Sequence, residues 1–261
     1  HGLDTVQRLA ERSYTITPED SQRVDDAQRA YDAAQQSTGA LFVQRHKASL
    51  ETDGGEVRQR LDDRRAFRAQ LAHDRDRLYV RYYVQSPAPL VNAVDDPQLI
   101  FTGGNLMDVQ LSTDAQADPE RDAPAPGDVR LLIGRRDDGE PIAVLYQSKR
   151  ENGGEPIVLR SPTGEESFAA IEMLDDIDLV HEAEDDGFTV TASVPLVALD
   201  WKPAAGEVLR GDVGYIFGNA TGTRAETRRY WRNNSFTANV TDDIPHESRL
   251  EPAEWGTMIV E

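Results

Sequence analysis

The feature that most constrains the fold is a series of short runs in which apolar and polar residues alternate. In residues 188–194 apolar side chains alternate with Thr and Ser, and in residues 107–112 they alternate with Asp, Gln and Ser. This period of two is typical of a strand with one buried face and one solvated face. Asp-Asp-Gly turns at 137–139 and 185–187 separate such runs and indicate β-hairpins.

Further short β-like runs extend to the C-terminus. They lie at Phe67–Ala72, Leu78–Val84, Val129–Gly134, Ile142–Gln147, Leu179–Glu184, Gly211–Phe217, Ala225–Trp231 and Gly256–Val260. Polar loops separate the runs, and helical signals are few after residue 40, which argues against a doubly wound parallel sheet. The sequence therefore predicts a mainly β fold, an antiparallel jelly-roll-like β-sandwich.

The first 60 residues have a different pattern. Residues 17–20 read Thr-Pro-Glu-Asp, a helix start with a capping hydroxyl and acidic residues at the positive end of the dipole. An apolar residue then recurs every three or four positions until a helix end near Thr38. We expect residues 1–60 to form an N-terminal extension with one helix, packed on a sandwich that spans residues 61–261.

Charge and cysteine content exclude several classes of protein. The chain carries 47 acidic and 28 basic residues, a formal charge of −19, and such a chain repels the phosphate backbone of nucleic acids. The absence of cysteine excludes disulfides, thiolate metal centres and cysteine nucleophiles. No apolar run approaches the ~18 residues of a membrane span. The composition is that of an acidic, soluble globular protein.

Signatures of catalysis are missing from the sequence. There is no G-x-S-x-G elbow, no P-loop and no G-x-G-x-x-G after a strand. His181-Glu182 and His246-Glu247 begin like a zinc-protease motif, but the second histidine is absent in both. We therefore expect a protein that is not an enzyme. A pair of carboxylates suited to glycoside hydrolysis stays open as an alternative.

One segment combines aromatic and polar residues in the way that sugar-binding sites do. Aromatic rings stack on sugar rings, while Arg and Asn side chains hydrogen-bond to hydroxyls. The candidate ligand-binding residues are Trp231, Tyr230, Arg228, Asn233 and Asn234. The alternative is that one aromatic ring lies in the core and the other packs under arginine stems. Trp201 follows an apolar segment and is expected in the core, whereas Trp255 enters the last run and is expected in the core or in edge packing.

An acidic, proline-rich loop at residues 114–128 is a candidate cation site. Calcium prefers six to eight oxygen ligands, which such a loop can supply. The candidate metal ligands are Asp114, Asp118, Glu120 and Asp122, with other acidic loops at 95–96, 175–178 and 242–243 as alternatives. The simpler interpretation is that these are solvated loop acids.

The order of the runs resembles family 9 carbohydrate-binding modules and related DOMON-like sandwiches. Residues 68–82 are similar to that family's "x-A-x-L-A-x-D-x-x-x-L-Y-V-x-Y" hairpin, and residues 107–111 to a strand that carries an acid at the same point. Residues 188–196 and the closing Glu-Trp-Gly at 254–256 also fit. The resemblance covers about residues 60–261. It implies a jelly-roll-like sandwich, often with structural calcium.

The resemblance also implies a function. Family members hold a sugar between two Trp rings and are commonly attached to secreted polysaccharide-degrading enzymes. Here Trp231 is the best candidate, with Tyr230 or Phe236 as its partner or with none. We expect a non-catalytic carbohydrate-binding module of a secreted or periplasmic, multidomain protein, with an oligo- or polysaccharide as its partner. The alternatives are a haem-binding electron-transfer domain with Met107 as axial ligand, and a purely structural or interaction domain.

Overall fold

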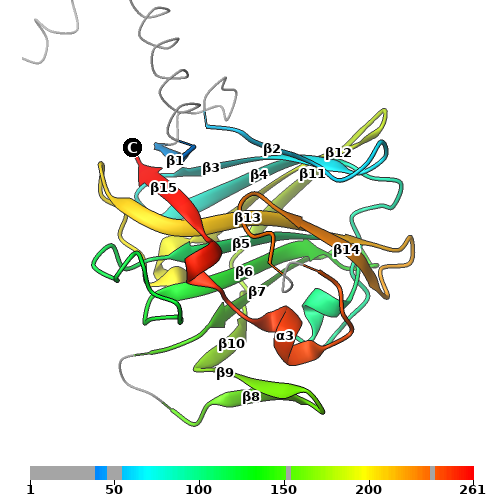
Figure 1. The fold of residues 1–261 in the computed structure, drawn as a ribbon. Coiled ribbons are helices and arrows are strands. Elements are labelled where there is room, and N and C mark those ends of the chain that lie inside the picture. Colours follow the sequence, from blue (N-terminus) through cyan, green and yellow to red (C-terminus); the bar gives the residue numbers. More distant parts are fainter. Residues whose placement is uncertain (1–38, 46–54, 151–153, 236–238) are drawn as a thin grey trace, which may run out of the picture. The chain divides into compact units, whose positions relative to one another are not determined.

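The main feature of the fold is a curled sheet of 13 strands (Figure 1). The structure is a computed structural model, and it describes residues 39–45, 55–150, 154–235 and 239–261. The strands are β1 (Leu41–Arg45), β2 (Val57–Arg60), β3 (Ala66–His73), β4 (Arg77–Gln85), β5 (Leu106–Ser112), β6 (Asp128–Arg135), β7 (Pro141–Gln147), β10 (Ala170–Met173), β11 (Asp178–Glu184), β12 (Gly187–Pro195), β13 (Val208–Gly218), β14 (Ala225–Tyr230) and β15 (Gly256–Val260). A separate hairpin consists of β8 (Ile157–Ser161) and β9 (Gly164–Phe168). The helical turns are η1 (Ile100–Thr102), η2 (Leu196–Leu199), α3 (Ile244–Ser248) and η4 (Pro252–Glu254).

The strand order along the sheet is β10-β7-β6-β5-β13-β15-β1-β3-β4-β12-β11, with β14 beside β13 and β2 beside β3. All neighbours are antiparallel except β1, which runs parallel to both β15 and β3. The predicted hairpins at residues 137–139 and 185–187 are confirmed, as β6–β7 and β11–β12. The predicted mainly β sandwich is therefore confirmed, with β1 as the parallel strand that joins its two halves.

The sheet curls so that its two halves face each other. Tyr82 on β4 and Tyr215 on β13 lie in opposite halves, and their ring centroids are 6.2 Å apart. The ring centroids of Phe67 on β3 and Tyr215 are 6.4 Å apart. These rings belong to one core of buried apolar side chains to which both halves contribute. Met107, the residue considered for haem, is fully buried in this core.

A second core covers the outer face of β5, β6, β7 and β13. It contains side chains from η1, the β8–β9 hairpin and the segment around η4, including Phe101, Phe168 and Trp255. The residues on both faces of β5 are consequently buried. The sequence predicted a solvated face on this strand, and that prediction is wrong. Asp108 and Gln110 lie under the second core, and Ser112 contacts Asp114 and Arg121 of the loop that follows β5.

The sandwich begins earlier in the chain than the sequence indicated. Strands β1 and β2 fall within residues 1–60, which were expected to be an extension, and both hydrogen-bond to β3. Leu41 and Val43 on β1 are buried in the first core, so this short strand belongs to the sandwich. The expected helix between Thr17 and Thr38, and its packing, lie outside the described residues.

Candidate functional site

Three of the five predicted ligand residues are buried. Tyr230, Arg228 and Asn233 expose 3%, 4% and 6% of their surface. Their polar groups contact other protein groups rather than solvent. These three side chains are therefore not open to a ligand in this structure, because Tyr230 and Arg228 contact Asp108 and Glu247 and Asn233 contacts Asp212 and Glu251.

Tyr230 belongs to a buried ion-pair cluster centred on Asp108. The Arg130 guanidinium donates to both Asp108 oxygens, with an Nη2 to Oδ2 distance of 2.6 Å, and neither side chain exceeds 1% exposure. The Tyr230 hydroxyl donates to Asp108 Oδ2 at 2.6 Å. Burial lowers the pKa of Arg130, but the adjacent Asp108 carboxylate outweighs it and the net pKa is raised. Burial and Asp108 together raise the pKa of Tyr230.

Arg228 lies beside this cluster and pairs with Glu247 of α3. Its guanidinium donates to the Glu247 carboxylate and carbonyl and to the Phe101 carbonyl. The Glu247 carboxylate also accepts the backbone N–H groups of Thr241 and Asp242. Burial lowers the pKa of Arg228, and nearby Arg130 acts in the same direction. The geometry is that of a structural cluster holding α3 on the sheet.

Asn233 is positioned by Asp212, a fully buried carboxylate on β13. Asp212 accepts backbone N–H groups from Val213, Arg232 and Asn233, the last at 2.8 Å. Within the described residues it forms no ion pair. Burial raises the pKa of Asp212 to about 7, with Asp108 adding to the effect, although the three N–H groups oppose it.

Asp212 makes folding stability depend on pH in a defined direction. Between its ordinary pKa near 3.8 and the native value of about 7, the native state keeps a proton that the unfolded chain releases. Lowering the pH through this window therefore stabilises the native state, by up to about 1.4 kcal/mol per pH unit. Urea unfolding between pH 4.5 and 7.5 checks this against Asp212→Asn. The free energy of unfolding of the wild type minus that of the variant is expected to fall as the pH rises. A difference that does not change with pH contradicts the role assigned to Asp212.

Trp231 and Asn234 keep exposed surface. Asn234 is exposed, whereas Trp231 is half-buried and packs against the first core. The six-membered ring of Trp231 lies against Gly256, where a Cβ would come within 2.5 Å of it. The Arg232 guanidinium lies 5.6 Å from the Trp231 ring centroid. The ring is thus already engaged by the protein. Trp201, expected in the core, and Trp255, expected in the core or at its edge, are both 2% exposed.

The acidic loop between β5 and β6 folds on itself. Asp114 and Asp118 each accept the backbone N–H two residues later, at 2.8 and 2.9 Å, and so cap their own turns. Arg121 anchors the loop through an ion pair with fully buried Asp128. Glu120 and Asp122 are exposed. Nowhere in the described part of the chain do three His, Asp or Glu side chains gather as a metal ion requires, so the geometry lends the calcium prediction no support.

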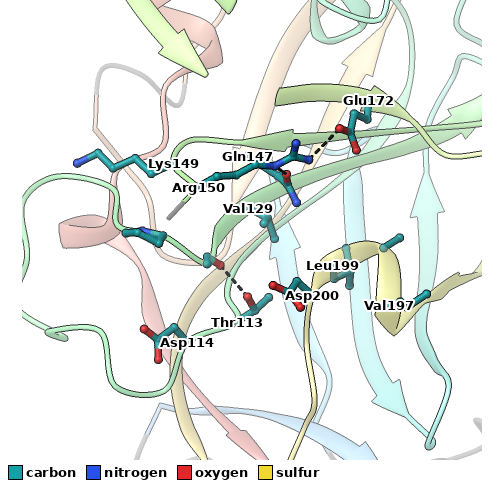
Figure 2. Close-up of a pocket in the computed structure, with 13 residues that line it drawn as sticks. Thr113, Asp114, Val129, Gln147, Lys149, Arg150, Glu172, Val197, Leu199 and Asp200 are labelled. Atoms are coloured by element: carbon teal, nitrogen blue, oxygen red, sulfur yellow. Dashed lines mark hydrogen bonds and ion pairs between the residues drawn. The ribbon is translucent and has the colours of Figure 1, made fainter. Parts of the chain in front are cut away.

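An open hollow of about 640 Å³ lies next to this loop (Figure 2). Its lining comes from four separate stretches and from β10: Thr113, Asp114, Pro126, Gly127, Val129, Gln147, Lys149, Arg150, Glu172, Val197, Ala198, Leu199 and Asp200. Figure 2 shows Gln147, Arg150 and Glu172 on one side and η2 with Asp200 on the other. Sequence reasoning named Asp114 alone among these, since the lining residues are distant in the chain and form no local motif.

Hydrogen bonds fix some side chains of the hollow and leave others available. Arg150 donates to Glu172 Oε1 at 2.8 Å and to Gln147 Oε1 at 2.6 Å. The Lys149 and Asp200 side chains make no hydrogen bond or ion pair with any described residue. Asp200 closes η2 with a left-handed backbone, φ 48°, a conformation that costs a non-glycine residue about 1 kcal/mol or more.

Comparison with known proteins places the fold. No protein-family model matches the sequence, and no curated protein does. The chain is similar to a family 9 carbohydrate-binding module from Caldicellulosiruptor kristjanssonii, solved in complex with glucose and in complex with cellotriose. Identity is 13% in both comparisons, the TM-scores are 0.51 and 0.52, and the match covers 85% of this chain and 95% and 93% of the others. The fold is therefore that of the carbohydrate-binding family 9 sandwich, as the sequence predicted.

Among the described residues, no helix is long and apolar enough to cross a membrane.

Proposed function

We propose that this chain is a non-catalytic carbohydrate-binding domain. The observation that carries the proposal is the fold: nearly the whole length of a module solved with glucose and with cellotriose matches this sandwich. Fold alone does not determine function, so the proposal also rests on an open, polar hollow of about 640 Å³, a size typical of small-ligand sites.

The proposal includes a cellular context. Polysaccharides that a binding module recognises lie mostly outside the cytoplasm, so the domain would work in a secreted or periplasmic protein. It would bring other domains of a longer chain close to an insoluble or polymeric substrate. Such a role needs tight and reversible contact but no catalytic group, which agrees with the lack of catalytic motifs in the sequence.

The aromatic-stacking mode expected from the sequence now rests on Trp231. The ring of its expected partner, Tyr230, is buried, and Phe236 lies outside the described residues. Trp231 can offer a sugar only the part of its surface that Gly256, Arg232 and the core leave free. Hydrogen bonding by charged and amide groups is therefore the more direct mode for this chain.

Saturable binding of a neutral oligosaccharide is the expected result. The full chain is titrated calorimetrically with glucose, cellotriose and a panel of soluble β- and α-linked oligosaccharides, at neutral pH. Binding of at least one of them, with no release of reducing sugar during the titration, supports a non-catalytic binding domain. Release of shorter sugars contradicts the non-catalytic part, and a panel without saturable heat contradicts the proposal.

A further inference from the structure

We propose that the hollow between the β5–β6 loop, the end of β7 and η2 is the saccharide site, and that it recognises its ligand by hydrogen bonds and an aliphatic surface rather than by aromatic stacking. The inference rests on the proposed function and adds the place and chemistry of binding. Among the described residues, neither Trp231 nor any other aromatic residue lines this hollow. The hollow is also open, whereas the buried cluster around Asp108 is sealed by the second core.

The hollow offers both kinds of hydrogen-bonding partner that a sugar hydroxyl needs. A hydroxyl donates one hydrogen bond and accepts others. Lys149 has an ammonium group that is free among the described residues, and Gln147 keeps its amide N–H groups because only its oxygen is bound by Arg150. On the opposite side Asp200 presents a carboxylate that no described residue binds. The lining of the hollow thus carries both donors and acceptors, with Gln147 and Asp200 on its two sides.

The charge of the hollow fits a neutral ligand. Its two bases, Lys149 and Arg150, nearly balance its three acids, Asp114, Glu172 and Asp200. This balance contrasts with the chain as a whole, whose formal charge is −19. The excess of acids would repel an anionic ligand, and the two bases would repel a strongly cationic one. A polyhydroxylated neutral molecule meets neither difficulty.

An aliphatic surface completes the lining. Val197 on η2 is 86% exposed, the largest value among the exposed large hydrophobic residues of the described chain, and it lies at the edge of the hollow. Exposed apolar surface beside convergent polar groups is typical of ligand sites. A sugar ring has an apolar face of C–H groups, which can cover Val197 while its hydroxyls reach Lys149 and Asp200.

Rigidity supports the same assignment. The left-handed backbone at Asp200 is held by its N–H, which donates to the carbonyls of Leu196 and Val197. Trp201, the next residue, is 2% exposed and its backbone N–H donates to the Leu196 carbonyl, so it anchors the turn in the core. Asp200 is thereby fixed at the edge of the hollow before a ligand arrives, which reduces the entropy lost on binding.

The test uses two double variants that change charge equally. Lys149→Ala with Asp200→Asn removes both free groups of the hollow. Lys202→Ala with Asp137→Asn is the matched control, since both residues are exposed, make no hydrogen bond or ion pair with described residues, and lie outside the hollow. Both variants are compared with the wild-type chain and with Trp231→Ala, using cellotriose and the best ligand of the panel. Thermal unfolding verifies that each variant is folded.

The assignment predicts a loss of about tenfold or more in affinity for the hollow variant, because two hydrogen bonds to charged groups disappear. The control variant and Trp231→Ala are expected to bind within about threefold of wild type. Wild-type affinity in the hollow variant, or a loss confined to Trp231→Ala, overturns the assignment and leaves the proposed function standing. Absence of binding by the wild-type chain overturns the proposed function itself.

Discussion

Replacing Asp108 with alanine is expected to lower the free energy of unfolding by about 3–5 kcal/mol. The carboxylate neutralises Arg130 and accepts the Tyr230 hydroxyl, and all three side chains are buried. Removing it leaves a buried guanidinium without its counter-charge, which is the costly way to break a buried ion pair. Urea unfolding followed by far-ultraviolet circular dichroism measures the change at neutral pH.

The matched control is an ion pair at the surface. Arg160 and Glu165 on the β8–β9 hairpin form an ion pair at 3.2 Å with 70% and 63% side-chain exposure. Glu165→Ala is expected to cost less than about 1 kcal/mol, because water screens both charges. A cost for Asp108→Ala as small as that of Glu165→Ala contradicts the account of the buried cluster.

Replacing Trp255 with alanine is expected to cost about 3–5 kcal/mol, the usual range for a buried aromatic side chain. Trp255 is 2% exposed, belongs to the second core, and donates its indole N–H to Gln110 Oε1 at 2.9 Å. The variant creates a cavity and leaves the Gln110 amide oxygen without this donor. Denaturant unfolding of the purified variant gives the value.

Trp231→Ala serves as the comparison for Trp255→Ala. Trp231 is half-buried, so truncation removes less buried surface and we expect a cost of about half as much or less. Trp255→Phe keeps most of the ring volume and is expected to lie between wild type and Trp255→Ala. Equal costs for the two alanine variants contradict the placement of Trp255 in a core and of Trp231 at its margin.

Local signals were sufficient to predict the hairpins. At residues 137–139 the turn places Gly139 at φ +93°, a conformation that glycine adopts without strain. At residues 74–76, Asp74 accepts the backbone N–H groups of Asp76 and Arg77, which is the role its side chain predicts in a turn. These contacts join residues that are close in the chain, so the local sequence is enough to predict them.

Contacts between distant segments could not be read in the same way. Asp108 and Gln110 alternate with apolar residues along β5. This alternation is the same whether water or another layer of the protein covers the polar face. Here η1, α3 and the β8–β9 hairpin cover it. Arg228 and Tyr230 have hydrogen-bonding groups that suit a sugar, but the same groups suit an internal ion-pair cluster.

The hollow illustrates a further limit of the sequence. Gln147 and Lys149 follow β7, whereas Val197 and Asp200 belong to the turn after β12. The two strands are far apart in the strand order of the sheet, yet the segments that follow them line one hollow. An exposed valine and an unpaired lysine are unremarkable in a sequence, and they indicate a site only once their neighbours are known.

Titration of the full chain with cellotriose, with wild type and the Lys149→Ala/Asp200→Asn variant side by side, tests the central claim most directly. The account predicts saturable binding by the wild-type chain and an affinity about tenfold or more lower in the variant. Equal binding by the two chains, or no saturable binding of cellotriose or any other saccharide of the panel by the wild type, would contradict it.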